Sequence, residues 1–283
     1  MKVFDNKRDL TIFLNSLDDQ KLSLGFVPTM GALHQGHLSL VSRAVKENDY
    51  VIISIYVNPT QFDNKSDLEK YPKTIDQDID VLNKLEFHNL ILFLPSDTEI
   101  YSGNFIKDKY DFNGIDNKME GEYRSGHFDG VATIIKKLFD IIKPNKAYFG
   151  EKDYQQLLIV KKLVNILGLS ISIVGCPIHR NDQGLALSSR NTRLTSAERS
   201  YASRIYEILL STKELFQYQQ LTEIKAWVKD QFLKDSIIHL EYFEIADNLT
   251  LTSASTINQS TKYRAFIAVK INNIRLIDNI ALN

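Results

Sequence analysis

Cysteine is almost absent from this chain of 283 residues, which contains only Cys176. A single thiol cannot form a disulfide within the chain, so a small disulfide-stapled fold is excluded. Such cysteine usage is typical of a reducing compartment, and we expect a cytoplasmic protein. Cys176 follows an apolar segment, and we expect it to be a small buried residue near a strand end rather than a nucleophile.

Long apolar runs are also missing. No stretch reaches the about 18 apolar residues that indicate a membrane-spanning helix, so no membrane partner is expected. The first residues, MKVFDNKRDLTIFL, carry charges throughout and lack a continuous apolar segment. They therefore do not predict a signal peptide.

Neither sign of charge is in excess. The chain has 34 basic and 35 acidic residues, for a formal net charge of −1. A large nucleic-acid footprint usually needs a basic face, so we expect no nucleic-acid partner. A local cationic pocket is still compatible with this balance. Proline is absent after Pro177, and neither a repeat nor a linker rich in glycine, serine or proline is visible.

Strand-like and helix-like segments alternate over residues 1–180. Strands are predicted at residues 22–26, 50–57, 90–94, 147–149 and 171–174, and helices at 38–45, 75–82, 131–142 and 154–167. Residues 50–57, YVIISIYV, suit a central strand that is buried on both faces. This alternation predicts an α/β domain with a doubly wound parallel sheet. Thr74 and Gln77 have the spacing of a capping box, and the less regular residues 96–129 are a candidate mobile lid.

The pattern changes near residue 180. Helices are predicted at 195–216, with Thr195 or Ser196 as the cap, and at 221–233. Strands are predicted at 239–245, 263–271 and 274–277. We therefore expect a second, smaller α+β domain over residues 181–283.

The segment PTMGALHQGH, residues 28–37, joins a predicted strand to a predicted helix. It places His34 and His37 three residues apart around Gly36. The first amides of a helix are unpaired donors, and the helix dipole favours negative charge there. The two imidazoles could therefore face the phosphates of a nucleotide. The alternative is a tight turn that carries two surface histidines.

Three further segments carry polar groups. GEKDYQQ (150–156) offers Lys152 and helix-start amides for phosphate, although Asp153 could simply cap the helix. LALSSRN (185–191) offers two hydroxyls and a guanidinium, or a helix cap. NPTQF (58–62) places amides beside an aromatic ring, which suits a small polar acid, or forms a plain turn. His127 either lines the site or lies in a turn.

In such a sheet, ligands bind beyond the carboxyl ends of the strands. The loops after Phe26, Val57 and Phe149 all lie at that edge in the predicted fold. This common position is the reason to expect that they converge on one ligand.

Taken together, these segments resemble the AMP-forming pantoate–β-alanine ligases. The matching stretches are VPTMGALHQGH, VNPTQF, YPKT, HFDGVATIIKKLF, FGEKDYQQL and LALSSRNTRL, which lie within residues 27–194. The resemblance implies a Rossmann-like nucleotidyltransferase domain, in which residues 34–37 stand in for the HIGH signature of the synthetases. Family members are typically homodimers that use ATP and Mg²⁺. The C-terminal third offers no sharp motif.

The resemblance also implies roles for individual residues. His37 is the implied proton donor, with His34 and Lys152 as further catalytic groups. Gln61 and Gln156 would hold pantoate, and Gln61 would also lie near β-alanine. The implied ATP contacts are Met30, Gly31, Ala32, Leu33, His34, Gln35, Gly36, His37, Gly150, Glu151, Lys152, Asp153, His179 through its main chain, Leu187, Ser188, Ser189 and Arg190.

Three positions depart from the usual family pattern. His179 replaces a small aliphatic residue. MEGEYRSGH lacks a proline before its glycine, and RNDQGLA lacks an acidic pair. We expect the last two changes to affect loop mobility rather than the chemistry.

The implied reaction activates the carboxylate of pantoate on ATP and transfers the pantoyl group to the amine of β-alanine. Three rivals stay open from the residues alone. They are a nucleotidyltransferase that keeps the nucleotide on its product, an aminoacyl-tRNA synthetase, and a nucleotide-binding regulator without activity. The short chain and its near-neutral charge argue against the synthetase.

Overall fold

The structure is a computed structural model, and the residues described are 1–18, 21–63 and 65–283. The chain divides into two compact units. The first comprises residues 1–151 and 156–177, and the second comprises residues 152–155 and 178–283. The functional domains 1–180 and 181–283 stay a prediction.

The first unit contains a six-stranded parallel sheet with the order β1-β4-β3-β2-β5-β6. Its strands are β1 (Lys2–Phe4), β2 (Leu24–Thr29), β3 (Tyr50–Ile55), β4 (Leu90–Phe93), β5 (Lys146–Gly150) and β6 (Ser172–Cys176). In β3, every residue from Val51 to Ile55 is buried. The predicted α/β class with a doubly wound parallel sheet is confirmed.

The strand order changes direction beside β2. From β2 the chain moves outward to β3 and β4, and it later returns to form β5 on the other side of β2. In doubly wound sheets, this reversal opens a crevice at the carboxyl ends of the two strands. The loops after β2 and β5 leave the sheet at this crevice.

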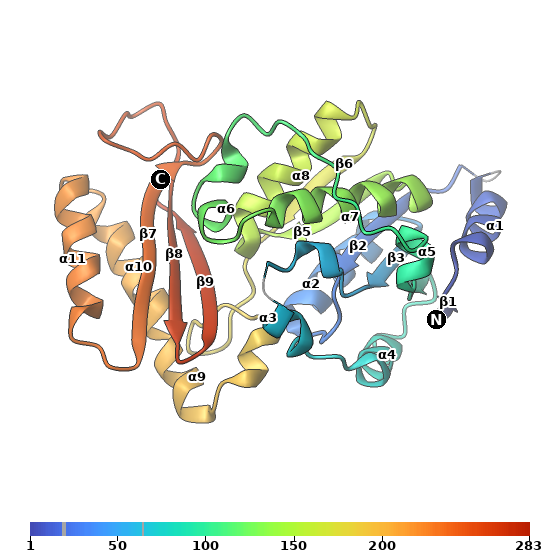
Figure 1. Ribbon diagram of the computed structural model, residues 1–283, viewed down its shortest axis with the longest axis horizontal. Helices are drawn as coiled ribbons and strands as arrows, with labels where there is room; N and C mark the ends of the chain where they lie inside the picture. Colours follow the sequence, from blue (N-terminus) through green and yellow to red (C-terminus); the bar gives the residue numbers. More distant parts are fainter. Residues whose placement is uncertain (19–20, 64) are drawn as a thin grey trace. The chain divides into compact units, whose positions relative to one another are not determined.

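Helices flank the sheet of the first unit (Figure 1). They are α1 (Lys7–Asp18), α2 (Gln35–Glu47), α3 (Lys65–Glu69), α4 (Ile75–Asn83), α5 (Asp97–Tyr101), α6 (Glu120–Tyr123), α7 (His127–Ile142) and α8 (Tyr154–Ile166), with short 3₁₀ turns η1 (Pro59–Gln61), η2 (Ile115–Asn117) and η3 (Glu151–Asp153). Helix α2 packs on β2, β3 and β5 through Leu38, Leu40, Val41 and Ala44. Residues 96–129 contain α5, η2 and α6, and their role as a lid stays a prediction.

One sequence prediction for the first unit is wrong, and two of its elements have no prediction. Thr74 precedes α4, but no capping box forms with Gln77. The hydroxyl of Thr74 donates instead to Asp78 Oδ1 at 3.3 Å. Strand β1 and helix α1 were not predicted, because β1 has only three residues and gains its partners from β4, far along the chain.

The second unit contains an antiparallel sheet in the order β7-β8-β9. Its elements are η4 (Ser189–Arg193), α9 (Ser196–Ala202), α10 (Arg204–Leu215), α11 (Leu221–Leu233), β7 (Ile238–Asp247), β8 (Tyr263–Ile271) and β9 (Ile274–Ala281). The single helix predicted at 195–216 is wrong, because it is divided at Ser203. The Ser203 hydroxyl donates to the carbonyl of Ser200 at 2.6 Å, a local bond that competes with the helical pattern. Of the two predicted caps, Thr195 and Ser196, it is Thr195 that caps α9, through a capping box with Glu198.

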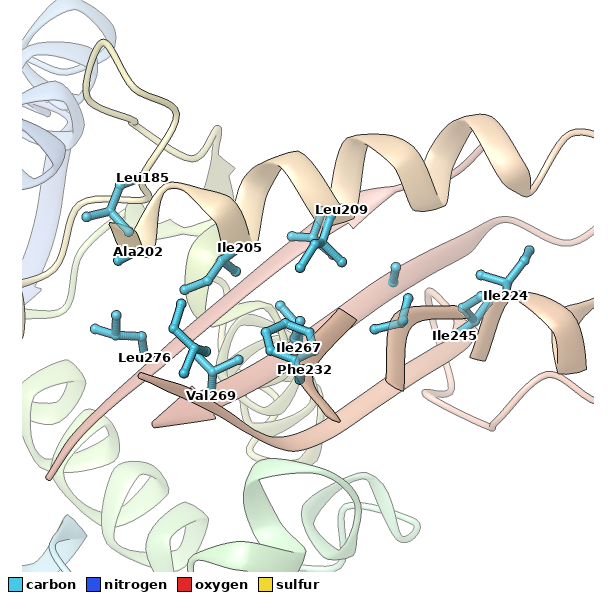
Figure 2. Packing of buried hydrophobic residues seen from close by; sticks show 14 of the residues in the cluster. Leu185, Ala202, Ile205, Leu209, Ile224, Phe232, Ile245, Ile267, Val269 and Leu276 are labelled. Carbon is cyan, nitrogen blue, oxygen red and sulfur yellow. The ribbon is translucent and has the colours of Figure 1, made fainter. Parts of the chain in front are cut away.

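A separate hydrophobic core stabilises the second unit. Leu209 of α10 and Ile224 and Phe232 of α11 pack on Ile245 and Ile267 of the sheet (Figure 2). This burial explains why a sheet with only three strands holds its shape.

Two further features of the described residues concern apolar helix length and the single cysteine. No helix in residues 1–18, 21–63 and 65–283 is long and apolar enough to cross a bilayer. Cys176 ends β6 and is buried, as predicted, and burial raises the pKa of its thiol. A raised pKa disfavours the thiolate, the form in which cysteine acts as a nucleophile.

Candidate functional site

In the first unit, three of the predicted site segments leave the same edge of the sheet. The histidine turn follows β2, the NPTQF turn follows β3, and the GEKD turn follows β5. Strand β2 pairs in parallel with both β3 and β5. The carboxyl ends of these strands therefore share one edge, and the segments begin side by side.

The two histidines form a local unit at the start of α2. His34 is the N-cap, and its Nδ1 accepts the N–H of Gly36 at 3.1 Å. The Nδ1 of His37 accepts the N–H of His34 at 3.3 Å. The two ring centroids are 4.0 Å apart, so the imidazoles lie side by side. The histidine pair is thus a capping box built from two rings.

This capping arrangement determines which ring nitrogen carries the proton. A neutral imidazole has one N–H and one acceptor nitrogen. Because Nδ1 accepts in both rings, the proton of the neutral form is on Nε2. In the neutral form each ring therefore carries an N–H at Nε2. An N–H of this kind can donate a hydrogen bond to a phosphate oxygen.

The turn before the histidines is held by a buried carboxylate. Asp78 of α4 is 2% exposed, and its two oxygens accept the N–H of Ala32 at 2.9 Å and of Leu33 at 2.7 Å. Gly31 and Ala32 both have positive φ values, 80° and 49°. For alanine this conformation is unfavourable, so the two hydrogen bonds that Asp78 accepts stabilise a strained turn.

The NPTQF turn is organised by Asn58, which is 1% exposed. Its side chain caps η1, accepts the hydroxyl of Tyr101 at 2.6 Å and donates to the carbonyl of Gly130 at 3.2 Å. Burial raises the pKa of Tyr101, which keeps this hydroxyl protonated as a donor. Gln61 then reaches the histidine turn, with its Nε2 at 2.7 Å from the sulfur of Met30. The structure thus brings Met30 and Gln61 together.

Gly130 permits the close approach of α7 to this turn. A Cβ atom there would lie 2.3 Å from the carbonyl oxygen of Thr60 and 2.7 Å from Cα of Gln61. His127, in the first turn of α7, places Nδ1 at 2.8 Å from the carbonyl oxygen of Gln61. His127 is buried, and it contacts the backbone of a predicted site residue.

The GEKD turn contributes residues to both units. Gly150 ends β5, and Glu151 begins η3. Gln156 is half-buried in the first turn of α8, whereas Gln155 is buried and belongs to the second unit. Lys152 and Asp153 also belong to the second unit.

In the second unit, the LALSSRN segment is anchored by a short hairpin. The carbonyl of His179 accepts the N–H of Leu187 at 3.0 Å, and the side chain of His179 is exposed. The predicted main-chain contact of His179 with ATP stays a prediction. Ser188 caps η4 by accepting the N–H of Arg190 at 3.3 Å, as the capping alternative expected. Ser189 is buried, and Arg190 is half-buried.

Three contributors to the site were not identified from the sequence. Asp78, Tyr101 and Gly130 all act through contacts with residues distant along the chain. The YPKT stretch ends only four residues before Asp78, yet nothing in the local pattern distinguishes Asp78 from the neighbouring acids. For Gly130, the apolar helix that surrounds it is a signal, because a helical glycine often marks a close approach.

Within residues 1–18, 21–63 and 65–283, no three or more His, Cys, Asp or Glu side chains gather as a metal site. Mg²⁺ rarely needs such a cage. It usually keeps several waters and is held by one or two carboxylates together with substrate phosphates.

Comparisons with known proteins agree along the whole chain. The family model for pantoate-beta-alanine ligase matches residues 2–281. The chain is 50% identical over 283 residues to pantothenate synthetases of Flavobacterium psychrophilum and Christiangramia forsetii, and it covers 100% of each.

Solved structures agree with the sequence comparison. A pantothenate synthetase from Thermus thermophilus matches with a TM-score of 0.91 at 36% identity, over 100% of this chain and 99% of that one. A pantoate-beta-alanine ligase from Francisella tularensis, described as complexed with beta-gamma ATP and beta-alanine, matches with a TM-score of 0.82 at 39% identity. That match covers 100% of this chain and 98% of the other.

Proposed function

Because the chain belongs to the pantoate-beta-alanine ligase family and is an enzyme of that ligase class, we propose that it condenses pantoate with β-alanine at the expense of ATP. The products are pantothenate, AMP and pyrophosphate, and the intermediate is pantoyl adenylate. The observation that carries this proposal is the paired capping of His34 and His37 at the switch point of the sheet. That pair places two imidazoles at the N-terminus of α2, which suits a polyphosphate.

ATP is assigned to the residues that the family resemblance implies. They are Met30, Gly31, Ala32, Leu33, His34, Gln35, Gly36, His37, Gly150, Glu151, Lys152, Asp153, the main chain of His179, Leu187, Ser188, Ser189 and Arg190. The backbone amides of the histidine turn are assigned to phosphate oxygens, and Lys152 and Arg190 to neutralising their charge.

The first chemical step joins two anions. An oxygen of the pantoate carboxylate attacks the α-phosphorus of ATP, the bond from that phosphorus to the bridging oxygen breaks, and pyrophosphate leaves. His37 donates its Nε2–H to the phosphate oxygens as negative charge develops there, and His34 and Lys152 stabilise the same charge. These side chains position and stabilise the reacting groups without forming a covalent intermediate.

The second step transfers the pantoyl group. The amine of β-alanine attacks the acyl carbon of pantoyl adenylate, the bond from that carbon to the phosphate oxygen breaks, and AMP and a proton are released. Water would hydrolyse the same mixed anhydride, so exclusion of water protects the intermediate.

Gln61 and Gln156 are assigned to pantoate, and Gln61 also to β-alanine. The contact between Gln61 and Met30 supports this assignment, because it joins the NPTQF turn to the histidine turn within one unit. Pantoate has a carboxylate, hydroxyls and an apolar centre, and the turn offers an amide beside the aromatic Phe62. Such a mixture of groups is typical of sites for small polar ligands.

We propose that Mg²⁺ would enter with ATP and would reduce the negative charge of its phosphates. The protein is further proposed to be a cytoplasmic homodimer, as the family resemblance implies. Sedimentation velocity of the purified chain tests the dimer, and titration of Mg²⁺ at constant ATP tests the metal requirement.

AMP release, measured with pantoate and β-alanine omitted in turn, tests the function. Full turnover requires both substrates, whereas pyrophosphate formation requires only ATP and pantoate. A nucleotidyltransferase would form its product without an amine. Pyrophosphate exchange into ATP that needs pantoate but not β-alanine identifies the adenylate; exchange without pantoate contradicts it.

A further inference from the structure

Strand β9 holds two of the segments assigned to ATP in the second unit. Its adjacent residues Asp278 and Asn279 are 4% and 1% exposed. Buried polar side chains are costly unless they are paired, so their partners indicate what they do. Successive side chains of a strand point to opposite faces, and these two contact different parts of the chain.

Asn279 holds the backbone at Lys152. Its Nδ2 donates to the carbonyl oxygen of Lys152 at 2.9 Å, across 127 residues of sequence. Its Oδ1 accepts from Arg264, whose guanidinium stacks at 4.0 Å on the ring of Tyr154, two residues beyond Lys152. Asn279 and Arg264 together therefore determine where Lys152 and Tyr154 of the GEKD turn lie in the second unit.

Asp278 holds the hairpin that leads to the LALSSRN segment. Its two oxygens accept from Nη1 and Nη2 of Arg180 at 2.6 and 2.9 Å. Arg180 also donates to the carbonyl of Gly184 at 3.0 Å and stacks at 3.8 Å on the ring of Tyr206. The backbone of Arg180 forms an antiparallel β-bridge with Ala186. Ala186 directly precedes Leu187–Arg190. A bidentate pair of this kind defines both position and orientation.

We propose that Asp278 and Asn279 are positioning residues that set the spacing between Lys152 and the Leu187–Arg190 segment. Two neighbouring residues of β9 hold the Lys152 backbone and the hairpin before Leu187–Arg190. The distance between the side chains of Lys152 and Arg190 therefore depends on the backbone of β9. A C-terminal strand without a sharp motif thereby contributes to adenylation. This inference rests on the proposed function, because it assumes that Lys152 and Arg190 bind ATP.

The substitution Asn279→Asp tests the first contact. An aspartate retains an oxygen that accepts from Arg264, but it has no N–H for the carbonyl of Lys152. We expect pyrophosphate release to fall by about tenfold to a hundredfold, the effect of misplacing a group that must be well oriented. Asn258→Asp is the matched control, because Asn258 lies in an exposed turn and its Oδ1 only accepts hydrogen bonds from Ser260.

A double-mutant cycle separates positioning from a general structural effect. In a Lys152→Ala background, Asn279→Asp should lower pyrophosphate release by less than about twofold, because the group it positions is gone. An equal fold-loss in both backgrounds would overturn the role of Asn279. If Asn279→Asp lowers the melting temperature, Asn279→Ser is measured in the same cycle.

The second contact is tested in the same way with Asp278→Asn in wild-type and Arg190→Ala backgrounds. A smaller loss in the Arg190→Ala background supports the positioning role of Asp278, and an equal loss removes it. Full activity of both Lys152→Ala and Arg190→Ala would overturn this inference while the ligase function stands. Failure of the wild-type chain to make AMP from pantoate and β-alanine would instead refute the proposed function.

Discussion

The carboxylate of Asp78 accepts the backbone N–H of Leu33 at 2.7 Å, although 45 residues separate them in the sequence. Its other oxygen accepts the N–H of Ala32. A side chain of α4 thus determines the conformation of the histidine turn. The histidines that follow begin α2 from a fixed position.

Asp78→Ala is expected to destabilise the protein and the turn. The buried N–H of Ala32 and the partly buried N–H of Leu33 lose their acceptor, at a cost of up to about 1–3 kcal/mol each in the free energy of unfolding. ATP binding should weaken as well, because Gly31 and Ala32 then leave their strained conformations. Asp78→Asn keeps one acceptor oxygen and should lie between Ala and wild type. Denaturant titration and calorimetric ATP binding measure the two effects. Asp80→Asn, an exposed change in the same helix, should alter neither; unchanged ATP affinity in Asp78→Ala would contradict the prediction.

His37→Ala is expected to lower the rate of pyrophosphate release by about a hundredfold or more, the usual effect of losing one donor to a developing negative charge. Two further variants separate the ring nitrogens. Asparagine places a polar atom near Nδ1, which accepts from His34, whereas glutamine reaches the position of Nε2. His37→Gln should therefore retain more activity than His37→Asn. Near wild-type release in His37→Ala would refute the assignment.

Gln61→Ala is expected to weaken pantoate binding more than ATP binding. The side chain contacts Met30 and lies in the turn assigned to pantoate, so its loss removes an amide that the acid would contact. The dissociation constants of both ligands, measured by calorimetry, give the comparison. Gln259→Ala, in an exposed turn of the second unit, serves as the control. Equal losses for pantoate and ATP would count against a pantoate role.

Asp235 is expected to make part of the stability depend on pH. Burial acts to raise the pKa of this carboxyl, but hydrogen bonds from Ile238, Tyr201 and Ile237, together with the charge of Arg204, outweigh it and lower the pKa. An unfolded aspartate titrates near about 3.9. The stabilisation is therefore complete above that pH and is lost as the pH falls through the lower folded-state pKa.

The free energy of unfolding, measured by denaturant titration from neutral pH to pH values below about 3.9, tests this prediction. Asp235→Asn should be less stable than wild type at neutral pH, and the difference should shrink in acid. Asp230→Asn, an exposed change in α11, should follow the wild-type profile. A difference that stays constant over this range would contradict the role given to Asp235.

Much of the fold was predictable because its signals are local. The apolar run at 50–57 predicted a buried central strand, and β3 occupies Tyr50–Ile55. The predicted bounds of α11 and β8 agree with the structure. Two predictions failed because side-chain hydroxyls form local hydrogen bonds in place of those expected. The Ser203 hydroxyl donates to the carbonyl of Ser200 where the predicted helix divides, and the Thr74 hydroxyl donates to Asp78 instead of capping the helix.

The candidate site shows the same division. The spacing of His34 and His37 indicated a shared role from sequence alone, and the structure places their rings side by side. The acceptor function of each Nδ1 became visible only in the geometry of the turn. Gly130 resembled any helical glycine until the backbone of Thr60 was seen where its Cβ would be.

The sequence by itself determined the alternation of the longer strands and helices and the spacing that pairs the two histidines, because periodicity and short spacings act within a few residues. Only the tertiary structure decided which buried groups hold those loops. Asp78 reaches Leu33 across 45 residues, and Asn279 reaches Lys152 across 127. Such hydrogen bonds leave no periodic trace in the chain, since they depend on the folded backbone bringing distant donors and acceptors within about 3 Å.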